Sequence, residues 1–249
     1  MTLLNNITKK SKQNIKQLGV LVDPDKCSPA SLKTLCTMAQ ESGTDYLLVG
    51  GSLLTRQNMS KCIAEIKRHS SLPVLIFPGN IMQIEPGADA LLFLSLISGR
   101  NPEMLIGNHV LAAPMLRNSG LEVIPTGYML VESGLVNSVM YMSNTTPIPR
   151  EKTDIAFCTA MAGEMLGLQL IFMDAGSGAK HPVPLEMIGL VKQHISLPLV
   201  VGGGIREAET AGDVWEAGAD LVIIGNAAEA RPGVISQAGK VKEAMNKQR

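Results

Sequence analysis

Residues 197–226 read LPLVVGGGIREAETAGDVWEAGADLVIIGN, and this stretch contains one complete strand–helix–strand unit. Its two apolar runs, 197–201 and 220–224, show no strict alternation of apolar and polar residues. Continuous apolar strands are typical of a parallel sheet that helices cover. The segment 207–217 between them is a plausible helix, and each run ends in a glycine-containing turn.

The same unit recurs along the whole chain. The expected strands are 18–22, 45–49, 73–77, 88–94, 121–125, 168–173, 197–201 and 220–224. The expected helices are 29–42, 58–69, 102–118, 150–166, 184–194, 207–217 and 229–246. Eight strands in near-regular alternation with helices favour an α/β fold of the (β/α)8 TIM-barrel type over an open sheet. We expect one domain that spans residues 1–249.

Three segments depart from the regular alternation. Residues 78–87, PGNIMQIEPG, contain two prolines and two glycines, so we expect a loop in place of the third helix. Residues 4–15 predict an additional helix that could close the bottom of the barrel. Residues 127–149 are the longest irregular connection, and long barrel loops are usually functional.

The composition excludes several classes of protein. Apolar residues make up 45% of the 249 residues and charged residues 18%, which is too apolar for a disordered chain. Lys plus Arg and Asp plus Glu are 22 each, so nothing indicates nucleic-acid binding. The apolar run 90–97 is far shorter than the roughly 20 residues of a membrane span. With no secretory signal and four cysteines typical of reduced thiols, we expect a cytoplasmic protein.

Glycine-rich turns follow the last three expected strands. A phosphate needs several backbone N–H groups close together, and glycine lets the backbone approach it without a Cβ. Gly203, Gly204, Gly225 and Asn226 follow the seventh and eighth strands, where TIM barrels usually bind phosphate. Gly176-Ser177-Gly178 would form a third wall of the pocket. The alternative is that these glycines only make tight turns, and two such turns together favour phosphate.

Carboxylates follow the first and the sixth strand. Asp174 could accept a proton from a ligand hydroxyl, or it could simply cap the next turn. Asp23 could hold Mg²⁺ with the hydroxyl of Ser52 nearby, because Mg²⁺ takes oxygen ligands and often needs only one or two carboxylates. The alternative for Asp23-Pro24-Asp25 is a turn, which the pattern alone slightly favours.

Several motifs together resemble the geranylgeranylglyceryl phosphate synthases, prenyltransferases of archaeal-type ether lipids that have bacterial relatives. They occur in order over nearly the whole chain: LVDPDK (21–26), GGS (50–52), IPTGYMLVESG (124–134), YMSNT (141–145), PIPR (147–150), AGSGA (175–179), GGGI (202–205) and GNA (225–227). No single motif is decisive, but the set is specific. The family usually has YLEAGSG at the sixth strand, where this chain has FMDAGSG (172–178).

This resemblance implies a barrel without its third helix and a magnesium ion at Asp23 and Ser52. It implies that sn-glycerol 1-phosphate is held by the sixth-strand loop and by the turns after strands seven and eight. The implied substrate-binding residues are Phe172, Met173, Asp174, Ala175, Gly176, Ser177, Gly178, Gly203, Gly204, Gly225 and Asn226. The version with IPTGYML resembles the subgroup that forms hexamers from dimers, so a homo-oligomer, dimer or hexamer, is expected.

The expected activity is therefore Mg²⁺-dependent prenyl transfer. A prenyl diphosphate, geranylgeranyl diphosphate by the resemblance, would join the free hydroxyl of sn-glycerol 1-phosphate as an ether and release diphosphate. Asp174 would orient this hydroxyl and take its proton, and the prenyl tail would lie in an apolar groove near strands three and four and residues 78–87. No transmembrane segment is expected, only transient membrane contact for a lipid product.

Two other functions remain compatible with the residues alone. A phosphosugar isomerase or cyclase barrel would share the phosphate site but would need no prenyl groove. A catalytically inactive barrel that binds a phosphorylated ligand would fit the altered sixth strand. Turnover of a phosphosugar without a prenyl donor would identify the first, and ligand-induced thermal stabilisation without turnover would identify the second.

Overall fold

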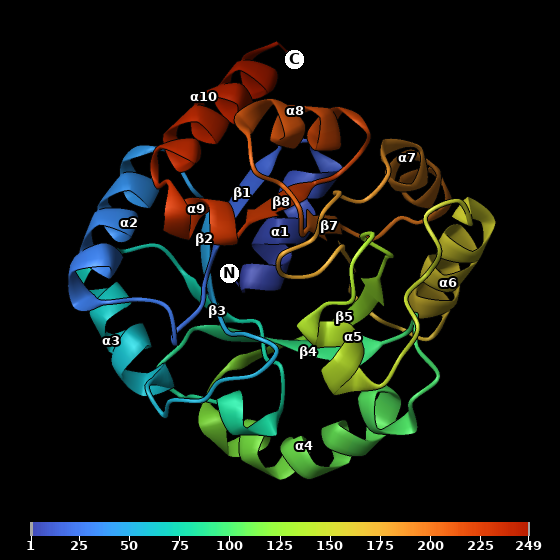
Figure 1. Ribbon diagram of the computed structural model, residues 1–249, viewed down its shortest axis with the longest axis horizontal. Coiled ribbons are helices and arrows are strands. Elements are labelled where there is room, and N and C mark those ends of the chain that lie inside the picture. Colours follow the sequence, from blue (N-terminus) through green and yellow to red (C-terminus); the bar gives the residue numbers. More distant parts are fainter. Residues whose placement is uncertain (1, 249) are drawn as a thin grey trace.

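The computed structural model describes residues 2–248, which contain eight parallel strands in a closed barrel (Figure 1). The strands are β1 (Gln17–Val22), β2 (Tyr46–Val49), β3 (Val74–Ile76), β4 (Ala90–Leu96), β5 (Glu122–Leu130), β6 (Leu170–Asp174), β7 (Leu199–Gly202) and β8 (Leu221–Ile224). They pair in sequence order, and β1 closes the barrel against β8. The expected TIM barrel is confirmed; positions 1 and 249 of the expected domain lie outside the described residues.

Helices follow the strands and surround the barrel (Figure 1). They are α2 (Pro29–Glu41), α3 (Met59–His69), α4 (Asn108–Ser119), α6 (Thr153–Met165), α7 (Leu185–His194), α8 (Ala208–Glu216) and α10 (Gly233–Lys247). The start of α2 follows from local chemistry, because Ser28 and Ser31 form a capping box and Pro29 occupies the first turn. None of the helices in the described part of the chain is long and apolar enough to cross a bilayer.

Two apolar layers hold the barrel together. Alternate strand residues point inward, where Leu48, Leu75 and Phe172 fill the barrel interior. Their neighbours point outward and pack against the helices, as Leu47, Val74 and Ile171 do. Both faces of every strand are therefore buried, which explains the continuous apolar runs in the sequence.

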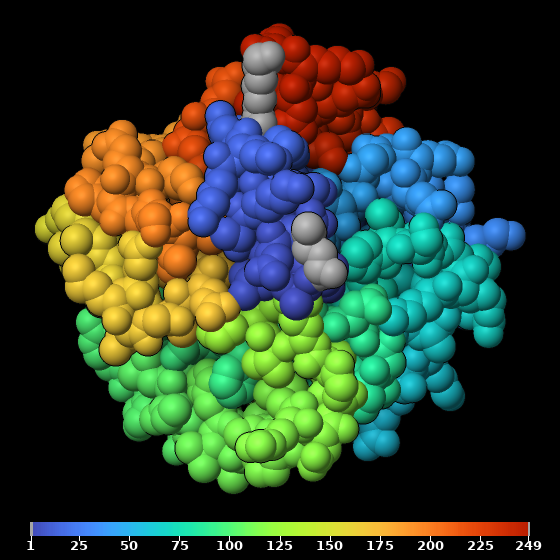
Figure 2. All heavy atoms as spheres, turned by 180° about the vertical axis from the view of Figure 1, so that it is seen from behind, coloured from blue at the N-terminus to red at the C-terminus, as the bar shows by residue number. Residues whose placement is uncertain are grey.

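Helix α1 (Leu3–Lys12) closes the bottom of the barrel, as expected for the N-terminal helix (Figure 2). Its Ile7 is fully buried and packs with the interior side chains. The carboxylate of Glu122, the first residue of β5, accepts hydrogen bonds from the backbone N–H groups of Leu3 (2.6 Å) and Leu4 (2.9 Å). An acidic side chain at a helix N-terminus satisfies otherwise unpaired donors and favours the helix dipole.

The unit after β3 lacks its helix, as expected. Residues 78–87 form a loop with a single 3₁₀ turn, η1 (Ile81–Gln83). The side chain of Asn80 caps this turn by accepting a hydrogen bond from the N–H of Met82 (2.9 Å). The fold therefore leaves the outside of β3 and β4 covered by a short loop, and this opening becomes important for the site.

Three expected elements were wrong in their bounds. The expected helix 229–246 is two helices, α9 (Asn226–Ala230) and α10, because Pro232 interrupts the backbone hydrogen bonding between them. The expected helix 102–118 begins with one wide turn, η2 (Glu103–Gly107), before α4. The connection 127–149 is not irregular throughout, because β5 continues to Leu130 and α5 (Ser138–Ser143) lies within it.

Candidate active site

The turns after β6, β7 and β8 meet at the carboxyl end of the barrel. The hydroxyl of Ser177 lies 3.3 Å from Asn226 Oδ1, which links the β6 turn to the β8 turn. The N–H of Ala175 donates to the carbonyl of Gly202 (3.1 Å), which links the β6 turn to β7. The glycine-rich segments that the sequence predicts for phosphate binding are therefore brought together on one side of the barrel mouth.

Gly203 and Gly204 have backbones that other residues rarely adopt. Their φ angles are +80° and +72°. A Cβ on Gly203 would lie 2.5 Å from Asp174 Oδ1, and a Cβ on Gly204 would lie 2.8 Å from the nitrogen of Pro182. The β7 turn can therefore pack against the β6 turn only with glycine at both positions.

Asp174, the last residue of β6, is a buried carboxylate with two donors. Its Oδ2 accepts the hydroxyl hydrogen of Tyr128 (2.6 Å), and its Oδ1 accepts the backbone N–H of Gly176 (2.8 Å). Burial raises the pKa of Asp174 above its ordinary value, while these two hydrogen bonds act in the opposite direction. A raised carboxyl pKa next to a predicted phosphate site is typical of a group that exchanges protons.

Tyr128 is a candidate functional residue that the sequence analysis did not single out. It lies on the part of β5 that was expected to be irregular, and its side chain points into the barrel, where it is buried. Burial and the charge of Asp174 raise the pKa of Tyr128 well above that of an ordinary tyrosine, so it acts as a neutral donor. Its presence in the IPTGYML motif was the available signal.

The other predicted residues of β6 and its turn face the barrel interior, the surrounding helices or neighbouring backbone groups. The ring of Phe172 is buried in the barrel, stacked on Phe77 (centroids 4.9 Å apart) and edge-on to Tyr128 (5.8 Å). Met173 points outward into the helix-facing layer, so its side chain is directed away from the mouth. The N–H of Ala175 donates to the carbonyl of Gly202, and the carbonyl of Ala175 accepts from Asn137 Nδ2. Both backbone groups of Ala175 therefore have partners within the protein.

Asp23 lies across the mouth from Asp174, directly after β1. Its Oδ1 accepts the N–H of Asp25 (3.0 Å), and its Oδ2 forms an ion pair with Lys26 Nζ (2.9 Å). The backbone N–H of Asp23 donates to Glu229 Oε1 (2.8 Å) on α9, a contact that sequence reasoning did not anticipate. Burial raises the pKa of Glu229, although the hydrogen bond from Asp23 and the charge of Lys26 lower it. The β1 and β8 turns are thus joined at a cluster of charged groups.

Asp23 and Ser52 are the residues that could hold a magnesium ion shared with a substrate. A Cβ on Gly51 would lie 3.6 Å from Asp23 Oδ1, so the backbone before Ser52 lies beside this carboxylate. Within residues 2–248, no three His, Cys, Asp or Glu side chains form a cluster that could hold a metal. A single carboxylate can suffice for Mg²⁺, which keeps waters and takes substrate phosphate oxygens, and the Ser52 hydroxyl would be a second oxygen donor.

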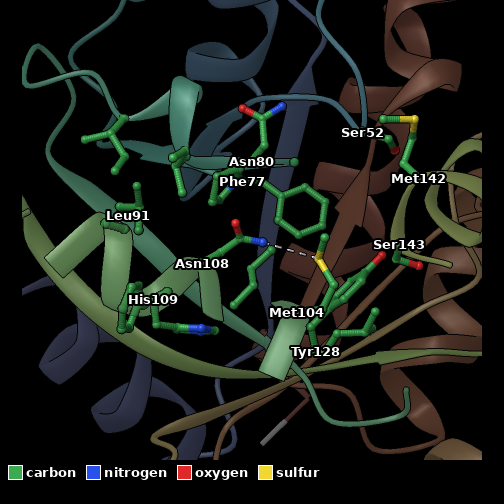
Figure 3. A pocket seen from close by; sticks show the side chains of 18 of the residues that line it. Ser52, Phe77, Asn80, Leu91, Met104, Asn108, His109, Tyr128, Met142 and Ser143 are labelled. Carbon is green, nitrogen blue, oxygen red and sulfur yellow. Dashed lines mark hydrogen bonds between the residues drawn. The ribbon is translucent and has the colours of Figure 1, made fainter. Parts of the chain in front are cut away.

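An apolar groove starts beside Ser52 and runs outward over β3 and β4 (Figure 3). Figure 3 shows Ser52 and Met142 at one end and Leu91 and His109 at the other. Its walls come from the 78–87 loop, β4, η2, α4 and β5, and they include Phe77, Ile81, Phe93, Leu94, Met104, Ala112 and Leu116. The missing third helix leaves this space open, and the groove lies where the sequence analysis expected it.

One residue, Tyr128, lies between the groove and the turns after β6, β7 and β8. The side chain of Tyr128 borders the groove, and its hydroxyl donates to Asp174. A ligand could place its apolar tail in the groove and its polar end at Ser52. The polar end would then lie close to the carboxylate of Asp174. The arrangement can hold an apolar, anionic ligand and a phosphorylated ligand side by side.

Comparisons with known proteins agree with this geometry. The PcrB family matches residues 11–245 of the chain. The chain is 50% identical over 231 residues to a geranylgeranylglyceryl phosphate synthase of Spirosoma linguale, covering 93% of each chain. It is 48% identical over 235 residues to one from Chitinophaga pinensis, covering 94% of this chain and 93% of the relative.

The most informative structural relative is a crystal structure of (S)-3-O-geranylgeranylglyceryl phosphate synthase from Thermoplasma acidophilum in complex with its substrate sn-glycerol-1-phosphate. It superposes with a TM-score of 0.92 at 33% sequence identity. The alignment covers 98% of this chain and 99% of the other. This relative is similar along the whole barrel, including both sides of the mouth.

Proposed function

The chain belongs to the PcrB family, and on that premise we propose that it joins a prenyl group from geranylgeranyl diphosphate to sn-glycerol 1-phosphate, with Mg²⁺ as cofactor. It is a prenyltransferase of the geranylgeranylglyceryl phosphate synthase type. The length of the prenyl chain, the glycerol phosphate enantiomer and the metal are the parts that we propose for this chain.

The observation that carries the proposal is the position of Tyr128. It borders the apolar groove and holds the Asp174 carboxylate at 2.6 Å, so one side chain contacts both halves of the mouth. A phosphosugar isomerase or cyclase would have no use for a groove lined by Phe77, Phe93 and Leu116. An apolar groove of this kind fits a linear chain of methyl-branched prenyl units, whose burial supplies binding energy.

The glycerol phosphate would bind on the side of β6, β7 and β8. Its phosphate would lie on the turns with Gly203, Gly204, Gly225 and Asn226, and Ser177 could donate its hydroxyl to it. The free terminal hydroxyl would then point to Asp174. The carboxylate orients that hydroxyl and takes its proton as the oxygen forms the new bond to carbon C1 of the prenyl group.

Asp23 and Ser52 would hold the magnesium ion at the start of the groove. Bound there with the diphosphate, Mg²⁺ would neutralise the negative charge that develops when the bond from C1 to the diphosphate oxygen breaks. Lys26, which pairs with Asp23 at 2.9 Å, adds a second positive charge for the leaving diphosphate. The ether product keeps the prenyl carbons and the glycerol phosphate, while diphosphate leaves and the proton stays on Asp174.

A turnover assay tests the proposal directly. The protein is incubated with Mg²⁺ and geranylgeranyl diphosphate, and sn-glycerol 1-phosphate and its 3-phosphate enantiomer are offered separately. We expect a prenyl ether, detected by mass, from the 1-phosphate alone. An equal yield from both enantiomers would overturn the acceptor assignment. A folded protein that binds glycerol phosphate and makes no ether would be the inactive binding barrel.

We further propose that the protein forms homo-oligomers, a dimer or a hexamer. Large apolar side chains are exposed along η2 and α4, and they include Ile106, Val110, Leu111 and Met115. Surface apolar groups gathered on one element often mark a protein interface. Light scattering of the purified protein distinguishes a monomer of 26.5 kDa from these assemblies.

The cellular setting is also a proposal. Cys27, Cys36, Cys62 and Cys158 are free thiols, which supports a reducing compartment and hence the cytoplasm. Tyr141 and Met142 are exposed on α5 beside the groove and could touch a membrane transiently when a lipid product leaves. Cell fractionation would test the cytoplasmic location, and flotation with lipid vesicles would test the membrane contact.

A further inference from the structure

Gln83 is a buried polar side chain in the loop that replaces the third helix. Only 2% of its surface is exposed, although it lies in a loop. Its Nε2 donates to the carbonyl of Gly51 (2.7 Å), and its Oε1 accepts the N–H of Gly79 (3.1 Å) and that of Gly51 (3.4 Å). One amide group therefore joins the turn after β2 to the turn after β3.

The two turns that Gln83 joins are pressed tightly together. A Cβ on Gly79 would lie 2.2 Å from the carbonyl oxygen of Gly51, and a Cβ on Gly50 would lie 1.9 Å from that of Phe77. No side chain can separate the backbones at this point, so their spacing depends on the glycines and on the amide between them. Partly buried backbone groups of Gly51 and Gly79 would lose their partner without Gln83.

Both turns carry groups of the part of the mouth that we propose holds Mg²⁺ and the prenyl diphosphate, called here the donor half. Ser52, the candidate metal ligand, directly follows Gly51, while Phe77, Pro78 and Gly79 line the groove beside it. The distance between Ser52 and this wall decides where the diphosphate sits relative to the prenyl tail. A shift of about 1 Å at a reacting centre can lower a rate by about a hundredfold.

We propose that Gln83 is a positioning residue that sets the geometry of the donor half by clamping the Gly51–Ser52 turn to the start of the groove. The inference rests on the proposed function for the identity of the donor, but the clamp itself acts on any Mg²⁺–diphosphate ligand at Ser52. Gln83 contacts neither the acceptor turns nor Asp174 through any of its three hydrogen bonds. Its loss should therefore affect one half of the site.

The first test compares two buried glutamines. Gln83→Met removes the amide but keeps an unbranched side chain of similar length. Gln17→Met is the matched control, because Gln17 is also fully buried and bonded, accepting from Tyr46 Oη (3.0 Å) and donating to the Ile7 carbonyl (3.4 Å), but at the bottom of the barrel. The dissociation constants for inorganic diphosphate with Mg²⁺ and for glycerol phosphate are measured by calorimetry for both variants.

We expect Gln83→Met to weaken Mg²⁺–diphosphate binding by about tenfold and to leave glycerol phosphate binding unchanged. Gln17→Met should lower the melting temperature and change neither constant. Equal weakening of both ligands in Gln83→Met, or the same pattern in both variants, would show a general structural effect and overturn the proposal. Unchanged diphosphate binding in Gln83→Met would overturn it as well.

A second pair of variants leaves Gln83 in place. Gly79→Ala would push the two turns apart through the contact with Gly51, whereas Gly87→Ala in the same loop meets no atom closer than 3.6 Å. We expect Gly79→Ala to reproduce the selective loss of diphosphate binding and Gly87→Ala to behave as wild type. If Gly79→Ala binds Mg²⁺–diphosphate as tightly as the wild-type protein does, the clamp is contradicted.

Turnover separates this inference from the proposed function. If the wild-type protein makes no prenyl ether but binds Mg²⁺–diphosphate in a Gln83-dependent manner, the proposed reaction fails and the clamp stands. If the wild type makes the ether, Gln83→Met should raise the KM for the prenyl donor by about tenfold and leave the KM for glycerol phosphate unchanged. An unchanged donor KM with a normal acceptor KM would overturn the clamp while the reaction stands.

Discussion

Asp174 places a carboxyl group where burial disfavours its charged form. The carboxylate is buried, and the hydrogen bonds from Tyr128 and Gly176 only partly offset the loss of water. Because burial raises the pKa of Asp174, the folded protein keeps this proton to a higher pH than the unfolded chain does. The free energy of unfolding therefore falls as the pH rises through that interval. The proposed role as the base that takes the proton of the glycerol phosphate hydroxyl would account for a carboxyl group at this buried position.

The first prediction concerns Asp174→Asn. The amide fits the same two partners, because its oxygen can accept from Gly176 and its nitrogen can donate to the Tyr128 hydroxyl oxygen. We expect turnover to fall by at least about a hundredfold, the usual contribution of a general base, while the melting temperature stays equal or rises. Steady-state kinetics and thermal unfolding measure the two. Activity close to wild type would remove the base assignment.

The second prediction concerns the pH dependence of turnover. The base must be deprotonated, so the rate should rise with pH through the raised pKa of Asp174. The hydrogen bond from Tyr128 lowers that pKa, so Tyr128→Phe should raise it and move the acidic limb of the kcat profile to higher pH. Tyr141→Phe, at an exposed tyrosine of α5, is the control. A limb that does not move in Tyr128→Phe would show that Asp174 is not the titrating group.

At the residue scale, the sequence predicted groups that stand at strand ends. Asp23, Ser52, Asp174 and the turn glycines follow from the rule that barrel sites gather at the carboxyl ends of strands. It missed Tyr128, Glu229 and Gln83, because their roles depend on contacts across the chain. Glu229 reaches Asp23 across 206 positions and Tyr128 reaches Asp174 across 46, and no local pattern records such pairs.

At the element scale, the sequence predicted the loss of the third helix correctly but placed the end of the fifth strand too early. The loop 78–87 was foreseen because its prolines and glycines cannot form a helix. The expected strand 121–125 instead stopped before Gly127, although Gly127 lies within β5. A Cβ there would lie 2.9 Å from the Cδ1 atoms of Ile171 and Ile97, so this glycine serves close packing rather than a turn.

The third prediction tests the tie between α1 and β5. Glu122→Ala removes the carboxylate that accepts the N–H groups of Leu3 and Leu4. We expect the free energy of unfolding to fall by about 1–2 kcal/mol, the usual cost of a lost N-cap, with turnover unchanged because α1 lies at the opposite end of the barrel. Chemical denaturation measures it, with the exposed Glu216→Ala as control. A loss of turnover without a loss of stability would contradict the role.

At the scale of the whole molecule, the barrel divides its mouth into two halves. Strands β1 to β4 present Asp23, Ser52 and the groove, β6 to β8 present the glycine-rich turns that we propose bind phosphate, and β5 lies between them with Tyr128. The chain has a formal net charge of +0, so attraction of anionic ligands depends on local groups such as Lys26 and on backbone N–H donors. Separate halves imply that the two substrates can bind independently.

The fourth prediction uses that independence. Removing Mg²⁺ with a chelator should abolish turnover, because the leaving diphosphate loses its counter-charge, but should leave glycerol phosphate binding intact. Glycerol phosphate at about 100 times its dissociation constant should stabilise the fold by about 2.7 kcal/mol whether or not the chelator is present. Thermal unfolding with and without each ligand measures this. If the chelator also removed the stabilisation by glycerol phosphate, the metal would belong to the acceptor half, and Asp23 and Ser52 would not be its ligands.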